Sequence, residues 1–184
     1  VPFRALYLQP KIIGAINWND GGSFINEIFE PALRGAADRL ANFVGAETKS
    51  LVFMSNSIEG VNAVSRSLSF GPVDHQILTT NQAYQGVVNS LRYDCTRTGA
   101  EVITVSLPWP TLEAKRVVEA VLGPPVRLSV FDHISSNGAV VMPIKRLVEL
   151  CCEHDIPVFV DGAHATGIIA LDITDVDRLA SAVG

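Results

Sequence analysis

The chain has 184 residues, of which 48% are hydrophobic and 18% charged, and its formal net charge at pH 7 is −5. This composition predicts a globular core of ordinary size and excludes an intrinsically disordered chain. The basic residues are scattered rather than clustered with aromatic ones, so nucleic-acid binding is not expected. No apolar run approaches the roughly 20 residues that cross a bilayer, so no membrane association is expected either.

The three cysteines, Cys95, Cys151 and Cys152, fit neither a disulfide framework nor the spacing of a zinc site. We expect them to be buried or half-buried thiols on helices, because free cysteine packs as a small hydrophobic residue. The first residues of the chain lack the pattern of a signal peptide. Together these features favour a cytoplasmic protein with small-molecule or protein partners.

In chain order, residues 1–26 show no clear periodicity and are expected to form an N-terminal arm. Residues 27–44 have the spacing of one long helix, which Gly45 should end. Short β-rich segments then alternate with amphipathic helical ones. We expect strands at 51–55, 76–80, 101–107, 126–135 and 156–160, and helices at 57–70, 84–98, 111–122 and 143–154.

This alternation predicts an α/β fold with three layers, in which a mostly parallel sheet carries helices on both faces. In such sheets ligands bind beyond the carboxyl ends of the strands. Polar side chains follow three of the expected strands, at residues 55–59, 132–137 and 161–164. The sequence therefore predicts a ligand site on this rim.

Asp161 ends an apolar segment, and a buried carboxylate is costly unless it meets a cation or strong hydrogen-bond donors. It could hold a protonated aromatic nitrogen, as in a pyridoxal 5′-phosphate (PLP) site, with Gly162 and Ala163 leaving room for a flat ring. Asp132, His133, Asp161 and His164 could instead form a zinc or iron site. In a purely structural interpretation, Asp161 caps the following turn and His164 donates to a backbone carbonyl.

Six segments together resemble one known family, although each alone is a weak signal. They are residues 56–62, Tyr84, 91–93, 97–101, 132–136 and 160–165. Their order and approximate spacing are similar to those of the class V aminotransferase superfamily, PLP-dependent enzymes of fold type I. Within it, the sequence is most similar to the isopenicillin N epimerase-like branch, near the cysteine desulfurases and cysteine-sulfoxide lyases.

The resemblance implies a phosphate site at the start of the helix expected at residues 57–70. The backbone N–H groups of Ser57, Ile58 and Glu59, with the hydroxyl of Ser57, would hold the PLP phosphate, since a helix N-terminus favours anions. Relatives usually have a hydroxyl residue where this chain has Ile58. Asn56 and Glu59 also match a capping box, which alone would explain the segment structurally.

The resemblance also implies positions around the PLP ring. Tyr84 would stack on one face and Ala163 would pack on the other. Asp161 would pair with the ring nitrogen, while His164 and Ser136 would lie near the phenolic oxygen. His164 is the one residue of this set that we expect to be catalytic.

The family's Schiff-base lysine lies on a strand beyond the Asp161–His164 motif, and we expect none of Lys11, Lys49, Lys115 and Lys145 to take its place. Residues 27–184 are therefore expected to be a partial PLP-binding large domain that is inactive by itself. The full-length protein would be a homodimer that acts on an amino acid or a sulfur-containing derivative, by epimerisation, transamination or C–S cleavage. The alternatives are a non-catalytic binding or assembly domain and, less favoured, the metal enzyme.

Overall fold

The structure of this chain, a computed structural model, describes residues 22, 24–70, 75–107 and 126–175. It divides into two compact units, Val1–Phe53 and Met54–Gly184. Most of the expected N-terminal arm and the whole helix expected at 111–122 lie outside the described residues. Within the described part, no helix combines the length and the apolar character that a membrane crossing requires.

The first unit contains the long helix that the sequence predicts. A π-helical segment, Phe24–Phe29, leads into α3, Glu30–Val44, and Gly45 ends it with a left-handed backbone at φ 66°. The prediction of a strand at residues 51–55 is wrong. A short 3₁₀ helix, Thr48–Ser50, precedes these residues, which pair with no described strand, and the side chain of Val52 is 77% exposed. Apolar composition alone did not make a strand there, because strand preference reflects packing against neighbours.

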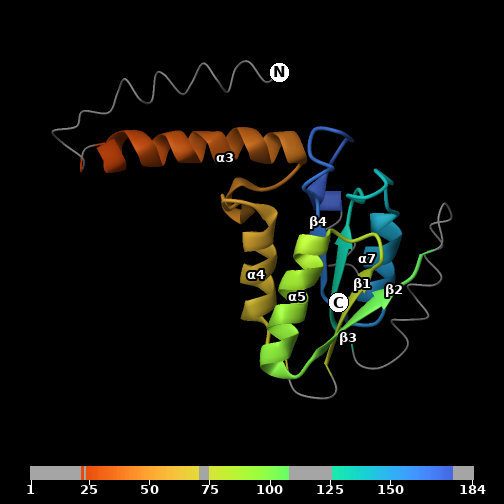
Figure 1. Ribbon diagram of the computed structural model, residues 1–184. Coiled ribbons are helices and arrows are strands. Elements are labelled where there is room, and N and C mark those ends of the chain that lie inside the picture. The colour runs from red at the N-terminus through yellow and green to blue at the C-terminus, as the bar shows by residue number, and fades with distance from the viewer. Residues whose placement is uncertain (1–21, 23, 71–74, 108–125, 176–184) are drawn as a thin grey trace. The chain divides into compact units, whose positions relative to one another are not determined.

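The second unit is built on a four-stranded parallel sheet (Figure 1). Its strands are β1, Gln76–Thr80, β2, Glu101–Val105, β3, Val126–Asp132, and β4, Val158–Asp161. Their order in the sheet is β2-β1-β3-β4. The chain thus moves from β1 to one side and returns to continue on the other, which makes the boundary of β1 and β3 a topological switch point.

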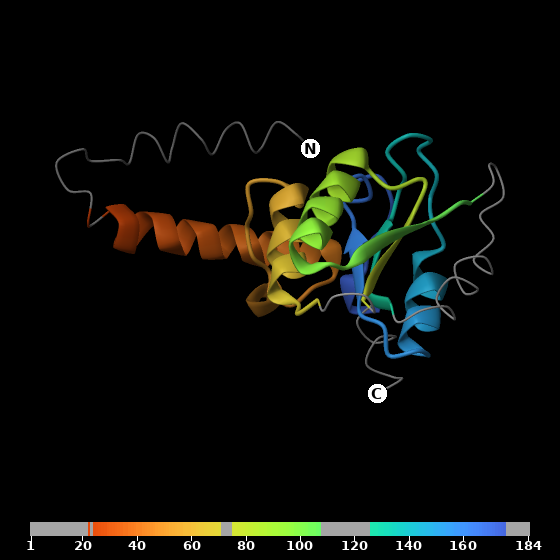
Figure 2. The ribbon, with the colours of Figure 1, turned by 60° about the horizontal axis from the view of Figure 1, so that its bottom comes forward.

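Helices cover both faces of this sheet, which confirms the predicted three-layer α/β fold (Figures 1 and 2). The helices are α4, Ser57–Ser67, α5, Gln85–Thr98, and α7, Ile144–Cys152. Adjacent strand residues enter different cores, since side chains alternate across a strand. The core under α4 and α5 contains Val61, Ile77, Leu91, Cys95 and Val130, and the core under α7 contains Leu78, Phe131, Leu147, Val148 and Cys151.

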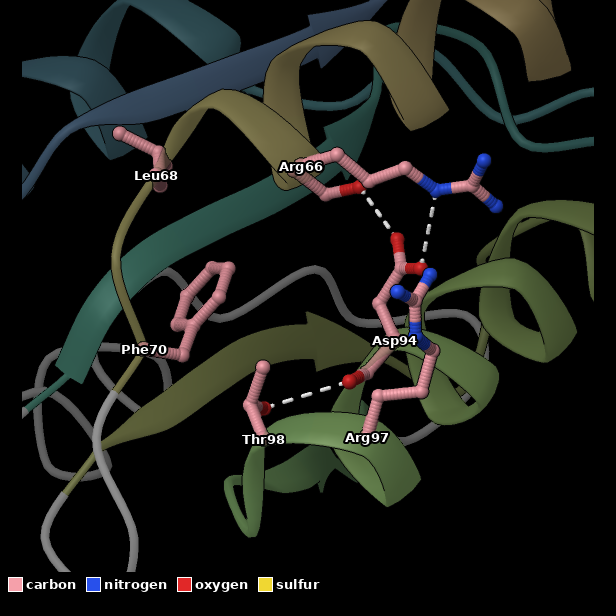
Figure 3. A pocket seen from close by; sticks show the side chains of 7 residues that line it. Arg66, Leu68, Phe70, Asp94, Arg97 and Thr98 are labelled. Atoms are coloured by element: carbon pink, nitrogen blue, oxygen red, sulfur yellow. Dashed lines mark hydrogen bonds and ion pairs between the residues drawn. The ribbon is translucent and has the colours of Figure 1, made fainter.

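A buried carboxylate joins α4 to α5 (Figure 3). Asp94 on α5 accepts a hydrogen bond from the Ser65 hydroxyl at 2.6 Å and an ion-paired bond from Nε of Arg66 at 3.1 Å. Ser65 and Asp94 are both buried, whereas Arg66 reaches solvent. These bonds therefore link the two helices whose first turns frame the site described below.

Replacing Ser65 with alanine should lower the free energy of unfolding by about 1–3 kcal/mol, because one buried oxygen of Asp94 loses its donor. Ser67→Ala on the same helix is the matched control: its hydroxyl donates to the backbone oxygen of Val64 at an exposed position. We expect the control to change stability by less than about 0.5 kcal/mol. Urea denaturation of both variants measures the difference, and equal losses would contradict a specific role for Ser65.

Candidate active site

A cavity of about 300 Å³ lies where β3 and β4 end and where α4 and α5 begin. This volume is at the lower end of the range of small-molecule sites, roughly 300–1,000 Å³. Six residues predicted for the site from sequence line it together. The described residues that line it are Ser57, Tyr84, Asp132, Ile134, Ser136, Asp161, Ala163 and His164.

The first turn of α4 reaches the cavity through Ser57. Asn56 caps the helix, because its side-chain oxygen accepts the Glu59 N–H at 2.9 Å. The Glu59 carboxylate accepts the Ser55 N–H at 2.8 Å. Hydrogen bonding to Ser55, first through its side chain and then through its backbone, lowers the pKa of Glu59. The expected capping box is thus present, with Ser55 rather than Asn56 as the second donor.

The structure differs from the sequence prediction at Glu59 and Ile58. The N–H of Glu59 is already used by Asn56, and neither Glu59 nor Ile58 is among the residues that line the cavity. In the described part of the chain, the N–H groups of Ser57 and Ile58 donate to no protein acceptor. These two groups, with the Ser57 hydroxyl, are the donors left at this helix start for a bound anion.

Tyr84 follows β1 as the residue that begins α5, and its side chain is 43% exposed. Gly86 makes this ring position possible. A Cβ atom at residue 86 would lie 2.7 Å from Cε1 of Tyr84 and 3.1 Å from Cδ1 of Ile58. The ring therefore lies over the first turn of α5, beside Ile58, in space that a larger residue at position 86 would fill.

Two carboxylates, Asp132 and Asp161, are paired neighbours at the ends of β3 and β4, and both side chains are buried. Asp132 accepts the Tyr84 N–H at 3.1 Å, and Asp161 accepts the Ala163 N–H at 3.0 Å. Neither carboxylate meets a basic side chain of the described residues through a hydrogen bond or an ion pair. The cavity thus offers negative charge to a cationic group or a strong donor.

The pKa of Asp132 is raised to about 6, first by burial and then by the negative charge of Asp161. Hydrogen bonds from the backbone N–H groups of Tyr84 and Ser136, and the nearby His164, act in the opposite direction. From sequence, the only role predicted for Asp132 is that of a metal ligand. The signal that could have revealed its position is the parallel pairing of two strands that both end in aspartate.

The structural interpretation of Asp161 and His164 holds only in part. The bond from Ala163 N–H to Asp161 closes the turn after β4 as that interpretation expects. The imidazole of His164, however, is exposed and has no hydrogen-bond partner among the described residues. It remains available to a ligand in the cavity that it lines.

Three of the four residues considered for a metal site line the same cavity, but His133 does not, so the predicted four-residue site is wrong. His133 lines a different cavity, of about 350 Å³, together with Ile144, Lys145 and Val160. Burial lowers the pKa of His133. Among the described residues, no group of three or more histidine, cysteine and acidic side chains could hold a metal ion. The reason is strand geometry, which sends adjacent residues to opposite faces of the sheet.

Lys145, on α7, lines that second cavity and pairs with Asp175 at 3.2 Å. Lys49 belongs to the first unit, where hydrogen bonding to Glu47 raises its pKa. Lys11 and Lys115 lie outside the described residues. Neither described lysine is among the residues that line the cavity of Asp161.

Comparison with known proteins assigns the family. The model of the class V aminotransferases matches residues 18–182, so the chain belongs to this family. A putative L-cysteine desulfhydrase of Oryza sativa subsp. japonica is 29% identical over 83% of this chain and 35% of its own length. Isopenicillin N epimerase of Amycolatopsis lactamdurans is 31% identical over 82% of this chain and 39% of its own length. The chain thus spans between a third and two fifths of these relatives.

Solved structures share the fold at lower identity. A cystine C–S lyase in complex with its product cysteine persulfide has a TM-score of 0.84 at 21% identity, over 94% of this chain and 47% of that protein. A cysteine desulfurase of Escherichia coli has a TM-score of 0.78 at 17% identity, over 95% of this chain and 45% of that protein. The predicted family and fold are therefore both confirmed.

The raised pKa of Asp132 predicts a specific dependence of stability on pH. Between its ordinary value of 3.8 and about 6, the folded chain keeps a proton on Asp132 that the unfolded chain releases. The contribution of Asp132 to stability should therefore fall by about 3 kcal/mol as the pH rises through this window. Asp132→Asn removes the titration, so the unfolding free energy of the variant relative to wild type should rise by that amount.

Urea denaturation at a series of pH values measures this difference. Asp155→Asn is the control, because Asp155 is exposed and its left-handed backbone, at φ 57°, is one that asparagine also adopts. We expect the control difference to stay constant with pH. A constant difference for Asp132→Asn would show that Asp132 ionises normally in the folded protein.

Proposed function

We propose that this chain contains the cofactor-binding part of a PLP-dependent enzyme that acts on an amino acid or a sulfur-containing amino-acid derivative. One observation carries the proposal: Asp161 is buried at the end of β4 and meets no basic side chain of the described residues. A protonated pyridine nitrogen is the kind of partner that such a carboxylate needs. The names of the relatives, which include desulfhydrases, an epimerase and a sulfoxide lyase, support the substrate class.

The residues of the cavity fit PLP in size and in chemistry. Asp161 would hold the ring nitrogen in its protonated form, and Tyr84 and Ala163 would pack on the two faces of the ring. Aromatic stacking of this kind contributes about 1 kcal/mol and fixes the ring plane. A ring held in this way by a carboxylate and two packing groups has one defined orientation in the cavity.

At the start of α4, the Ser57 hydroxyl and the N–H groups of Ser57 and Ile58 would bind the phosphate. We propose a smaller part for Glu59 than the family resemblance implies, because its N–H already donates to Asn56. The N-terminus of α4 adds the favourable end of the helix dipole. This arrangement would set the phosphate and the ring nitrogen at opposite ends of the cavity.

Bound PLP supplies an electron sink for bonds at the α-carbon of an amino acid. Asp161 would keep the ring nitrogen protonated, which this function requires. His164 and Ser136 would hydrogen-bond the phenolic oxygen, and the exposed imidazole of His164 could also move a proton at that atom. Epimerisation, transamination and C–S cleavage share these requirements, so the remainder of the full-length protein would select among them.

The proposal extends to the organisation of the full-length protein. Residues 27–184 would be part of the large domain, and the Schiff-base lysine would come from another part of the full-length chain. We further propose a homodimer located in the cytoplasm. The family resemblance supports the dimer, which light scattering would test, and the three unpaired cysteines support a reducing compartment.

Pyridoxine 5′-phosphate tests the site without the covalent bond, because it lacks the aldehyde that a lysine attacks. We expect it to bind the protein more tightly than unphosphorylated pyridoxine does. Asp161→Ala and Tyr84→Ala should each weaken binding about tenfold, as expected for the loss of an ionic or stacking contact. Tyr93 is an exposed tyrosine on α5, the helix that begins at Tyr84, and Tyr93→Ala should leave the affinity unchanged. Isothermal titration calorimetry measures these affinities. If the Asp161→Ala, Tyr84→Ala double variant binds pyridoxine 5′-phosphate as tightly as wild type does, the proposal is refuted.

Gly86→Ala offers a second test, because its Cβ atom would displace the Tyr84 ring while leaving every polar group of the site intact. We expect affinity for pyridoxine 5′-phosphate to fall several-fold with little loss of stability, since alanine favours the helix. Gly35→Ala, whose Cβ would meet only Nη1 of Arg39 at 3.7 Å, is the control. Unchanged affinity in Gly86→Ala would remove Tyr84 from the proposed ring contact.

A further inference from the structure

Asp132 connects two parts of the site that lie on either side of the switch point in the sheet. Its carboxylate extends from the end of β3, and the N–H that it accepts belongs to Tyr84, which follows the neighbouring strand β1. The two oxygens lie 3.1 Å and 3.4 Å from this nitrogen. Tyr84 begins α5 without a cap from its own side chain, so the anchor of this helix start comes from a residue 48 positions along the chain.

Asp132 also accepts the backbone N–H of Ser136, in the loop after β3. Tyr84 and Ser136 line the same cavity, so one carboxylate fixes the backbone at two separate points of its rim. The charged or titratable groups near Asp132 are Asp161 from β4, His164 from the turn after β4, and the phenol of Tyr84. None of the basic side chains of the described residues pairs with it.

We propose that Asp132 is a positioning residue for the cofactor: its ionised carboxylate holds Tyr84 and Ser136 in place at the cavity, and its protonation loosens both and weakens cofactor binding. This inference rests on the proposed function, because it assigns a regulatory property to the same site. Asp132 itself acts through the backbone of Tyr84 and Ser136. It therefore differs from Asp161, which would contact the ring nitrogen.

The direction of the pH effect follows from the surroundings of Asp132. Burial and Asp161 raise the pKa of Asp132 to about 6, so the group changes charge close to neutral pH. Above that value the anion accepts both N–H groups with charge-assisted bonds, which are roughly twice as strong as neutral ones. Below it the neutral acid keeps one carbonyl oxygen as acceptor, and the cavity also loses a negative charge that favours a cationic ring. Affinity should therefore fall as the pH drops below about 6.

The experiment compares dissociation constants of pyridoxine 5′-phosphate for wild type and Asp132→Asn between about pH 5 and about pH 8. The phosphate of the probe titrates in the same range, but it does so with both proteins and cancels in the ratio. We expect Asp132→Asn to bind about tenfold more weakly at about pH 8 and almost equally at about pH 5. Glu149→Gln, which removes a surface carboxylate that pairs with Arg146 on α7, should give a ratio of one throughout.

A second measurement follows Tyr84 without any ligand. This chain contains three tyrosines, so selective ¹⁵N-tyrosine labelling gives few backbone amide resonances, and Tyr84→Phe identifies the relevant one. We expect this resonance to titrate in wild type with a midpoint near the pKa of Asp132, about 6. Asp132→Asn should abolish the titration. Because the wild-type resonance is informative alone, the test stands even where the variant does not fold.

The outcomes separate this inference from the proposed function. If pyridoxine 5′-phosphate binds at no pH, the proposed function fails, whatever Tyr84 does. If it binds, but the ratio of dissociation constants is the same at every pH and the Tyr84 amide does not titrate, Asp132 has only a structural role and the inference is overturned. A ratio that rises with pH, together with a titrating amide, supports it.

Discussion

The parallel register of β3 with β4 is the constraint on which the site depends, because it places Asp132 directly beside Asp161. Two buried carboxylates at this spacing repel each other, and burial adds a cost of its own. The backbone N–H groups of Tyr84, Ser136 and Ala163 donate hydrogen bonds to these carboxylates and partly offset their negative charge. No basic side chain of the described residues completes the neutralisation. The remaining negative charge faces the cavity, where a cationic ligand would gain most from it.

The sheet determines which chemistry these strand ends can carry. Asp132 faces the cavity near α4 and α5, whereas the next residue, His133, faces the cavity beside α7. The same alternation divides the core, with Ile77 on one side and Leu78 on the other. His133 is therefore separated in space from its sequence neighbour Asp132 and from the other acidic and histidine residues of the cavity. This separation removes the metal site and leaves a carboxylate-lined cavity suited to a protonated ring.

Much of this arrangement could be predicted from sequence, because it depends on local patterns. The bounds of β1 agree with the prediction, as do the start of α4 at Ser57 and the end of α3 at Gly45. These features follow from side-chain periodicity and from capping residues close in sequence. Residues 51–55 were mispredicted because a short apolar run does not say whether a strand partner exists. The bond from Tyr84 to Asp132 was missed for a similar reason: it depends on strand order, which local patterns do not contain.

Asp94 and Asp132 show how one residue type can be equally buried in two very different surroundings. Each has a relative exposure of 4%. Asp94 has a hydroxyl from Ser65 and a guanidinium from Arg66, and it joins two helices. Among the described residues, the hydrogen-bond donors to Asp132 are all backbone groups, and a second carboxylate lies beside it, so its charge is neutralised less completely. A chain selected only for stability would give Asp132 a basic partner of its own. That the cavity lacks one among the described residues is the physical reason to place a cofactor there.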